Sequence, residues 1–426
     1  MAAESAARFE ALEDQAERIM GVFVRAGYER VAPAFIQPAE IFLDRIGEAL
    51  RNRTYVFTDP DGQELCLRPD LTIPAARIYM ERNPASDTEA RYCYNGPAFR
   101  YQPGEPDALR PRELRQAGLE SFGAPDREQA DAEVFGLILD AIRLAGLKGF
   151  QIRCGDLGLF RALLDALPIP ARWRYRLMHG FWRQERFHQV LRQLAEPAAP
   201  LADGQVAALA ASLDPADRLG AEQDVAAFIE ARNIALLGAR NLGEITERLL
   251  AAAADMREQP LSGQVVTLVE RYLAISGPPD EAMAAIAALT AEAGIDLSSP
   301  LEACRRREML LRETGIAPGT MQFAADFGRQ FEYYSGFVFQ IELPGRGVAG
   351  QIAGGGRYDG LLTSIGARRD APAVGSAIHT ERLLAARGAA DERRQADTRH
   401  SLQGSLDGTH GGLFRRAGPA FPQKRP

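Results

Sequence analysis

The chain has 426 residues, of which 46% are hydrophobic and 25% are charged, and its formal net charge is −7. This length and composition are typical of a globular protein with two or three domains. No apolar run approaches the roughly 18 residues that a membrane-spanning helix needs, and no basic segment stands out that would predict nucleic acid as the main partner.

The first part of the chain, residues 1–167, predicts short strands that alternate with helices. Hydrophobic residues at helical spacing predict helices over residues 8–26, 39–46, 71–81, 128–145 and 159–167. Strand-forming residues between turn signals predict strands over residues 28–35, 54–58, 64–67, 90–94, 98–101, 116–122 and 150–153.

Residues 168–265 differ in character, because they are rich in alanine, leucine and arginine and carry few strand signals. Their helical periodicity predicts an inserted helical module. Helices are expected to continue over residues 280–293, 301–314 and 361–365 and from residue 381, with strands at 321–327, 337–342, 348–353 and 374–377. Strands on both sides of the module indicate an α+β fold in which residues 1–167 and 266–388 complete one mixed sheet.

Residues 389–426 contain too few large apolar side chains to build a core, and we expect a disordered tail. The cluster Arg305, Arg306 and Arg307 is interpreted as a solvated helix face. Four cysteines without metal-type spacing are expected to be small core residues: Cys66, Cys93, Cys154 and Cys304. Neither a metal nor a cofactor is predicted, and unpaired cysteines fit a reducing cytoplasm.

Two short stretches near the end suggest a ligand pocket. Tyr333 and Tyr334 precede an apolar run, and the glycines of residues 354–356 precede Arg357 and Tyr358. A phenol offers a flat apolar surface and one hydroxyl, which suits a planar imidazole. Glycines let a backbone approach a ligand closely. The alternative is a buried tyrosine pair followed by a hairpin turn at the glycines.

Five motifs occur in a fixed order along the chain. They are LRPDLT at residues 67–72, FRYQ at 99–102, RQFEYY at 329–334, GGRYD at 355–359 and GSAIHTERL at 375–383. Together they resemble the catalytic core of class II aminoacyl-tRNA synthetases of the histidyl type, over roughly residues 8–388. The resemblance implies an antiparallel sheet flanked by helices, a helical insertion, and dimerisation through the N-terminal region.

The resemblance also assigns roles to residues that match the family's motifs. It places these residues around histidine: Asp70, Thr72, Gln116, Glu120, Arg329, Tyr333, Tyr334 and Tyr358. Asp70 and Gln116 would face the amino end, with Thr72 alongside, and Glu120 would face the imidazole. Arg100 and Arg382 match the arginines that grip ATP phosphates, here interpreted as a vestigial nucleotide site. Asp70 could also be a helix cap, which does not exclude the ligand contact, and the alternative for Glu120 is a surface or sheet-paired carboxylate.

Departures from the synthetase pattern suggest a regulatory paralogue. Only 44 residues follow Arg382 (426 minus 382), too few for an anticodon-binding domain, and Gln102 replaces a carboxylate of the second motif. This resembles the regulatory-subunit family of ATP phosphoribosyltransferase in histidine biosynthesis. It implies a non-catalytic subunit that binds L-histidine as effector, forms a dimer, and assembles with the short-form catalytic subunit, without tRNA or membrane. The retained Arg100, Arg329 and Arg382 leave a histidine-activating enzyme as the alternative.

Overall fold

The computed structural model describes residues 5–43, 53–102, 111–198, 201–232, 241–316, 319–329 and 333–387. The expected disordered tail, residues 389–426, lies outside the described residues, as do residues 330–332 of the tyrosine motif. None of the helices in the described part is both long enough and apolar enough to cross a membrane.

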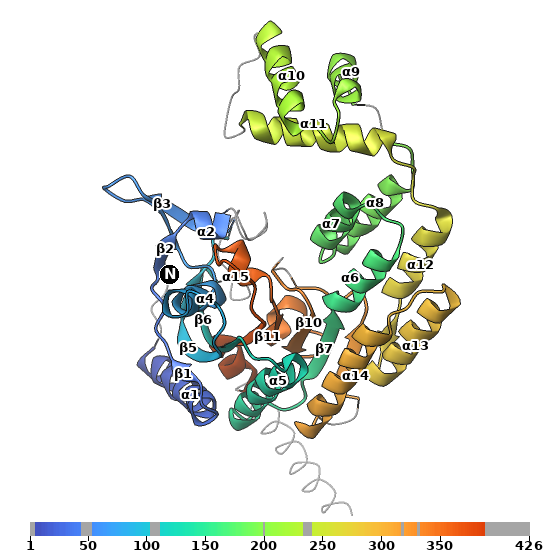
Figure 1. Cartoon of the computed structure of the whole chain (residues 1–426). Helices are drawn as coiled ribbons and strands as arrows, with labels where there is room; N and C mark the ends of the chain where they lie inside the picture. Colours follow the sequence, from blue (N-terminus) through green and yellow to red (C-terminus); the bar gives the residue numbers. More distant parts are fainter. Residues whose placement is uncertain are drawn as a thin grey trace, which may run out of the picture.

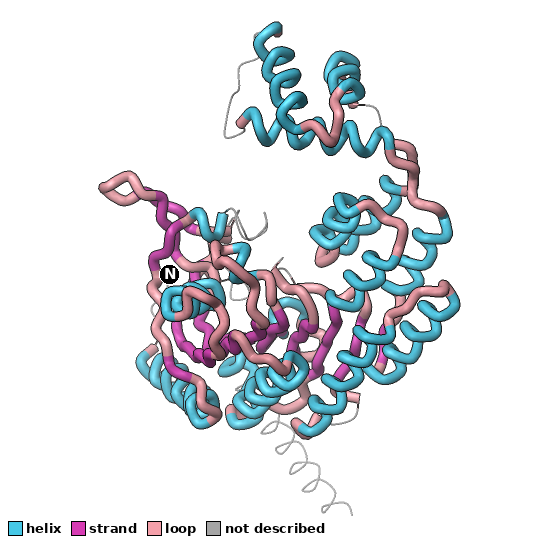
Figure 2. The backbone as a smooth tube through the Cα atoms, viewed as in Figure 1, coloured by secondary structure: helices cyan, strands magenta, loops and turns pink. Residues whose placement is uncertain are grey.

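A mixed sheet of nine described strands forms the centre of the molecule, with helices around it (Figure 1, Figure 2). Its strand order is β1-β5-β6-β12-β11-β10-β7-β9-β8. The strands are β1 (Glu29–Arg30), β5 (Ala90–Phe99), β6 (Glu113–Phe122), β7 (Gln151–Asp156), β8 (Ser276–Gly277), β9 (Met321–Ala324), β10 (Phe337–Glu342), β11 (Gln351–Arg357) and β12 (Ala373–His379). β6 lies beside β12, so distant segments complete one sheet, as predicted.

The pairing is antiparallel except between β1 and β5 and between β7 and β9, which are parallel. β5 is one continuous strand where the sequence predicted two. The prediction broke the strand at Gly96 and Pro97, but β1 pairs with β5 only at Tyr92 and Cys93. Pro97 therefore lies where β5 is an edge strand, and a proline without an N–H is tolerated there.

A small second sheet has the order β2-β4-β3. It consists of β2 (Ile36–Pro38), β3 (Tyr55–Thr58) and β4 (Glu64–Leu67), with the short helix α2 (Glu40–Leu43) beside it. Asp59 closes the β3–β4 turn, since its Oδ1 accepts hydrogen bonds from the backbone N–H groups of Asp61 and Gln63 at 3.0 and 2.8 Å. The strands predicted at residues 54–58 and 64–67 are confirmed, and they pair as an antiparallel hairpin.

Helices that pack on or beside the main sheet include α1 (Ala6–Arg25), α4 (Thr72–Arg82) and α5 (Arg127–Leu144). α1 buries the apolar residues at helical spacing except Phe9, which is exposed, and Ser5 caps its first turn. The N-cap of α5 is Asp126, whose carboxylate accepts a hydrogen bond from Gln129 N at 3.1 Å. Such a cap satisfies backbone donors that have no partner inside the helix.

The remaining long helices follow β7. They are α6 (Leu157–Ala166), α7 (Ala171–Gly180), α8 (Gln184–Leu194), α9 (Gly204–Ser212), α10 (Arg218–Ala231), α11 (Leu242–Arg257), α12 (Gly263–Leu273), α13 (Pro279–Glu292) and α14 (Ser298–Glu313). Trp173 and Phe187 of α7 and α8 belong to the main hydrophobic core. In contrast, α9 to α11 form their own small cluster around Leu213 and Val225 and project from the body in Figure 1. The boundaries 168–265 of the predicted insertion stay a prediction.

Two expectations about particular residues can be compared with the structure. All four cysteines are buried free thiols, as predicted. The interpretation of residues 305–307 as a solvated face is wrong for Arg307, which is only 8% exposed. α14 places Leu301, Cys304, Arg307 and Leu311 on its buried side, because residues three or four apart share one face of a helix.

Candidate functional site

A cavity of about 1090 Å³ opens on one face of the central strands. Eight of the ten predicted site residues line it: Asp70, Thr72, Arg100, Gln116, Arg329, Tyr333, Tyr334 and Arg382. The other two, Glu120 and Tyr358, are not among the described residues that line it. Their side chains are at most 1% exposed, and they hydrogen-bond to each other. The structure thus brings residues separated by more than 300 positions into one place.

The glycine run forms part of β11 in the middle of the sheet, so the hairpin-turn alternative is wrong. A Cβ on Gly354 would overlap the Arg329 guanidinium, and a Cβ on Gly375 of β12 would overlap the Glu120 carboxylate. Gly375 is directly paired with Glu120 across β12 and β6. The missing side chains therefore let Glu120 and Arg329 lie flat against neighbouring strands.

Glu120 is fully buried at the centre of a hydroxyl cluster. The Tyr94 hydroxyl donates to its Oε1 at 2.7 Å, and the Tyr358 hydroxyl donates to its Oε2. Burial raises the pKa of Glu120 to about 7, and hydrogen bonds from Tyr358, Tyr94 and Thr72 oppose this rise. A hydroxyl that donates to the carboxylate keeps its oxygen as an acceptor, so the cluster presents acceptors to a ligand's N–H.

Asp70 precedes α4 and is 3% exposed. Its Oδ1 accepts a hydrogen bond from Ile73 N at 3.3 Å, although the N-cap position of α4 is Leu71, one residue later than the capping interpretation placed it. Its Oδ2 is buried and has no hydrogen-bond partner among the described residues. Burial raises the pKa of Asp70 to about 6, although the Arg100 and Arg68 guanidinium groups favour its ionised form. A buried carboxylate oxygen without a partner is suited to an ammonium group.

Three tyrosine rings gather beside these acidic groups. The ring centroids of Tyr333 and Tyr334 are 4.8 Å apart, and those of Tyr333 and Tyr358 are 5.6 Å apart in an edge-to-face arrangement. The ring centroids of Tyr334 and Tyr358 are 6.3 Å apart. Edge-to-face contacts fix the orientation of each ring, so the cluster provides a rigid aromatic wall for a planar ligand.

Arginines collect around the rest of the cavity. Arg329 donates to Phe339 O at 3.0 Å, Arg100 to Pro69 O at 2.9 Å, and Arg382 to Gln351 O at 3.2 Å. Burial lowers the pKa of Arg100 to about 10. His379 is held neutral, because burial and the three nearby arginines keep its pKa well below its usual range. Guanidinium groups in this setting suit a carboxylate or a phosphate.

Sequence reasoning missed several residues of this site. Among them are Tyr94, Ser376 and His379, and the last two line the cavity. The spacing of Tyr92 and Tyr94 was a signal, because residues two apart on a strand share one face of the sheet. On β6 their partners are Glu120 and Gly118, respectively. Reading it requires the register between β5 and β6, which the sequence alone does not supply.

Comparisons with known proteins agree with this geometry. The family model described as histidyl-tRNA synthetase matches residues 4–257 and 235–383. A protein of Sinorhizobium medicae named ATP phosphoribosyltransferase regulatory subunit is 35% identical over 376 residues, which cover 87% of this chain and 96% of that protein. A protein of the same name from Rhizobium rhizogenes is 35% identical and covers 89% of this chain and 99% of its own length.

Solved structures show the same fold. An ATP phosphoribosyltransferase regulatory subunit/histidyl-tRNA synthetase from Bacillus halodurans superposes with a TM-score of 0.63 at 20% identity, covering 91% of this chain and 81% of its own. A histidyl-tRNA synthetase from Nostoc superposes with a TM-score of 0.57 at 15% identity, covering 89% and 72%. The predicted α+β class with a synthetase-like antiparallel sheet is confirmed.

Proposed function

Because this chain belongs to the histidyl-tRNA synthetase-like family of ATP phosphoribosyltransferase regulatory subunits, we propose that its cavity binds free L-histidine as a feedback effector. The chain is a non-catalytic subunit of the ATP phosphoribosyltransferase complex, which serves histidine biosynthesis. The observation that carries the histidine proposal is the unpartnered Asp70 Oδ2 in a cavity that Tyr333 and Tyr334 also line, with the buried Glu120 hydroxyl cluster beside them.

Each part of histidine has a chemical counterpart in the pocket. The ammonium group pairs with Asp70, with Gln116 and Thr72 of the same cavity lining beside it. The carboxylate pairs with Arg329, whose Nε is buried without a hydrogen-bond partner among the described residues. The imidazole lies against the tyrosine wall and donates its N–H to the cluster around Glu120. This arrangement supports an amino-acid ligand with a planar, hydrogen-bonding side chain.

Feedback needs two states of the complex that bind histidine with different affinity, and a coupling of about 1–3 kcal/mol is typical. The partner in this proposal is the short-form catalytic subunit, and neither tRNA nor a membrane takes part. The four free thiols fit a reducing compartment, and a cytoplasmic location belongs to the proposal.

Titration of the reconstituted complex with L-histidine tests this function. We expect saturable heat of binding by calorimetry and inhibition of ATP phosphoribosyltransferase activity over the same concentration range, because one pocket serves both. L-Histidinol lacks the carboxylate that would pair with Arg329 and serves as the matched weak ligand. Absence of binding to the complex contradicts the proposal, and robust histidine-dependent ATP–pyrophosphate exchange by this subunit would restore the enzyme alternative.

We also propose that the small sheet mediates self-association. Neighbouring β3 residues Val56 and Phe57 are 40% and 39% exposed, and Phe35 and Ile36 are 52% and 51% exposed. Successive strand residues point to opposite faces, so both faces of this hairpin present apolar groups to solvent. A second copy of the chain is the proposed occupant, which agrees with the dimerisation through the N-terminal region implied by the synthetase resemblance.

Phe57→Glu is expected to shift the subunit from dimer to monomer by at least about tenfold in dimerisation constant, since burying a charge in an apolar contact is costly. Sedimentation equilibrium over a concentration series measures the shift. Leu219→Glu is the matched control, because Leu219 is an exposed apolar residue of α10, outside the small sheet, and its substitution should leave association nearly unchanged. An unaltered constant for Phe57→Glu would place the self-association surface elsewhere.

A further inference from the structure

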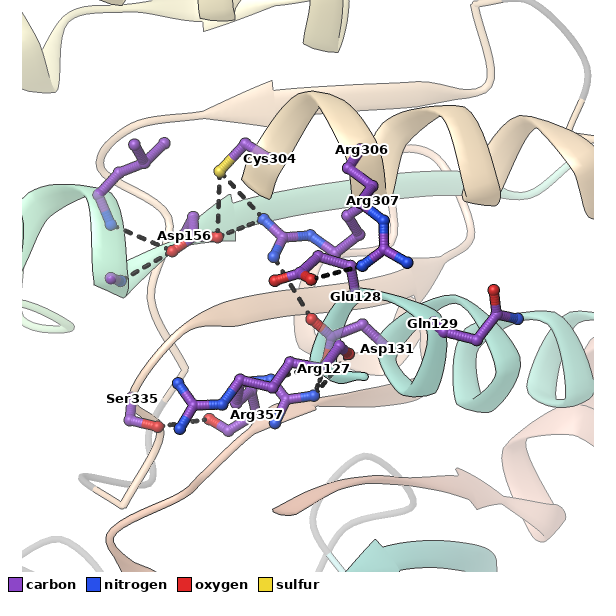
Figure 3. A network of polar contacts seen from close by, with 12 residues as sticks. Arg127, Glu128, Gln129, Asp131, Asp156, Cys304, Arg306, Arg307, Ser335 and Arg357 are labelled. Carbon is purple, nitrogen blue, oxygen red and sulfur yellow. Dashed lines mark hydrogen bonds and ion pairs between the residues drawn. The ribbon is translucent and has the colours of Figure 1, made fainter. Parts of the chain in front are cut away.

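Four buried charged residues link the pocket strands to the helices behind them (Figure 3). Asp131 of α5 is 1% exposed, Arg357 of β11 is 5% exposed, and Arg307 of α14 and Asp156 at the end of β7 are each 8% exposed. Two acidic and two basic side chains compensate one another. Burying ions is costly unless each keeps its partner and its hydrogen bonds, so the arrangement of this cluster is strongly constrained.

Arg357 does not line the cavity, and all three nitrogens of its guanidinium group make hydrogen bonds within the protein. Its Nε and Nη2 donate to Asp131 Oδ1 at 3.0 and 2.7 Å, and Nη2 also donates to Arg127 O at 2.7 Å. Its Nη1 donates to Asp359 Oδ1 at 2.8 Å. In Figure 3 the side chains of Arg357 and Asp131 point toward each other. With these bonds made, Arg357 acts on the fold rather than on a ligand.

The backbone around Arg357 carries the tyrosine rings of the pocket. Arg357 O accepts a hydrogen bond from Ser335 N at 2.8 Å, and Ser335 Oγ accepts one from Asp359 N at 3.0 Å. Ser335 follows Tyr334, and Tyr358 lies between Arg357 and Asp359. The segment that carries Tyr334 and the segment that carries Tyr358 are therefore hydrogen-bonded to each other next to Arg357, whose side chain pairs with Asp131.

Tyr358 connects this hydrogen-bonded backbone to Glu120. Its N–H donates to Ala373 O at 2.8 Å, and its hydroxyl donates to the Glu120 carboxylate. A shift of the Arg357 side chain moves the backbone of Tyr358, and with it the hydroxyl that orients Glu120. A displacement of this kind at a hydrogen-bonded site alters ligand affinity without removing any contact residue.

The other carboxylate oxygen of Asp131 faces the helices. Its Oδ2 accepts from Arg307 Nη1 of α14 at 3.3 Å, and Arg307 Nη2 donates to Asp156 Oδ2. Asp156 Oδ1 in turn caps α6 by accepting from Gly158 N and Leu159 N at 2.8 and 3.1 Å. Asp131 is thus the one described carboxylate that contacts both Arg357 of the pocket strand and Arg307 of α14.

We propose that Asp131 is a positioning residue for the histidine pocket, acting through Arg357 on Tyr358 and Glu120 and tying their geometry to α14 and α6. This inference rests on the proposed histidine site. Asp131 does not line the cavity, so its effect on the ligand is indirect. Because Asp131 also contacts Arg307, which in turn pairs with Asp156, a movement of α14 or α6 would change histidine affinity through these contacts.

The test is Asp131→Asn in the reconstituted complex, which keeps the size of the side chain and removes its charge. We expect the dissociation constant for L-histidine to rise about tenfold, since coupled neighbours interact on that scale. Arg306→Gln is the matched control, because Arg306 joins the same two helices through exposed pairs with Asp126 and Glu128 at 2.5 and 2.9 Å. It should leave the constant unchanged.

A general loss of stability has to be separated from mispositioning. Ile142→Ala opens a cavity in the buried face of α5, and we expect it to lower the melting temperature while histidine affinity is retained. If Asp131→Asn does not fold, Ser335→Ala is the second variant. It removes the Oγ that accepts from Asp359 N and donates to Arg357 O, and the expected loss of affinity is about threefold.

Unchanged affinity in folded Asp131→Asn, or in Ser335→Ala, overturns the positioning role while the proposed function stands. Equal losses in Asp131→Asn and Ile142→Ala at matched melting temperature overturn it as well, since the effect would then follow stability. Absence of histidine binding by the unaltered complex overturns the proposed function itself and takes this inference with it.

Discussion

Glu120→Gln is expected to weaken L-histidine binding by about 2–3 kcal/mol, or roughly 30- to 150-fold, while the subunit stays folded. The substitution preserves the shape of a fully buried side chain. It replaces an oxygen that accepts from Tyr358 or Tyr94 with an amide nitrogen that must donate. One tyrosine hydroxyl then has to accept from the amide instead of donating to the carboxylate. Its own hydrogen is left pointing to the place where the imidazole N–H needs an acceptor.

Calorimetry with L-histidine and the inhibition curve of the reconstituted complex measure this loss. Glu113→Gln is the matched control, because Glu113 begins the same strand and is exposed, and it should bind histidine as the unaltered chain does. Assembly with the catalytic subunit should persist in both variants, since Glu120 has no exposed surface. Normal affinity in Glu120→Gln would move the imidazole site away from this cluster.

The fold was accessible from sequence because motif order and strand periodicity agree. The strands expected at residues 116–122 and 374–377 correspond to β6 and β12, which pair directly. Periodicity could not reveal that residues 354–356 continue β11, because three glycines remove the alternation of side chains on which a strand prediction depends. In the structure, Gly354 leaves space for the Arg329 guanidinium, which a Cβ at that position would overlap.

The motifs named eight residues that line the cavity, but they could not predict its electrostatics. Asp70 was placed at the ligand's amino end from a motif, whereas its unpartnered Oδ2 and its raised pKa depend on burial by segments far away in the chain. Arg307 was misassigned because a run of three arginines suggests solvent exposure. Its partners Asp131 and Asp156 are 176 and 151 residues away, and no local pattern marks them.

Asp70→Asn is expected to weaken L-histidine binding by about 2 kcal/mol near pH 8, since a charge-assisted hydrogen bond to the ammonium group is lost. The ligand itself provides the control. Imidazole-4-propionate lacks the amino group, so it should bind the variant and the unaltered chain with similar affinity. Asp87→Asn is the matched surface variant, because Asp87 is exposed and pairs with Arg369, and it should bind histidine normally.

The pH dependence gives this prediction a second, independent readout. Burial raises the pKa of Asp70 to about 6 in the free pocket, and a bound ammonium favours the ionised carboxylate and lowers that pKa. Binding therefore expels a proton below about pH 6, and affinity falls as the pH decreases, by up to about tenfold per unit from this group. Histidine's own imidazole also titrates near pH 6.5, so the difference between the unaltered chain and Asp70→Asn isolates the carboxylate. Parallel pH profiles for the two proteins would show that the ammonium group does not contact Asp70.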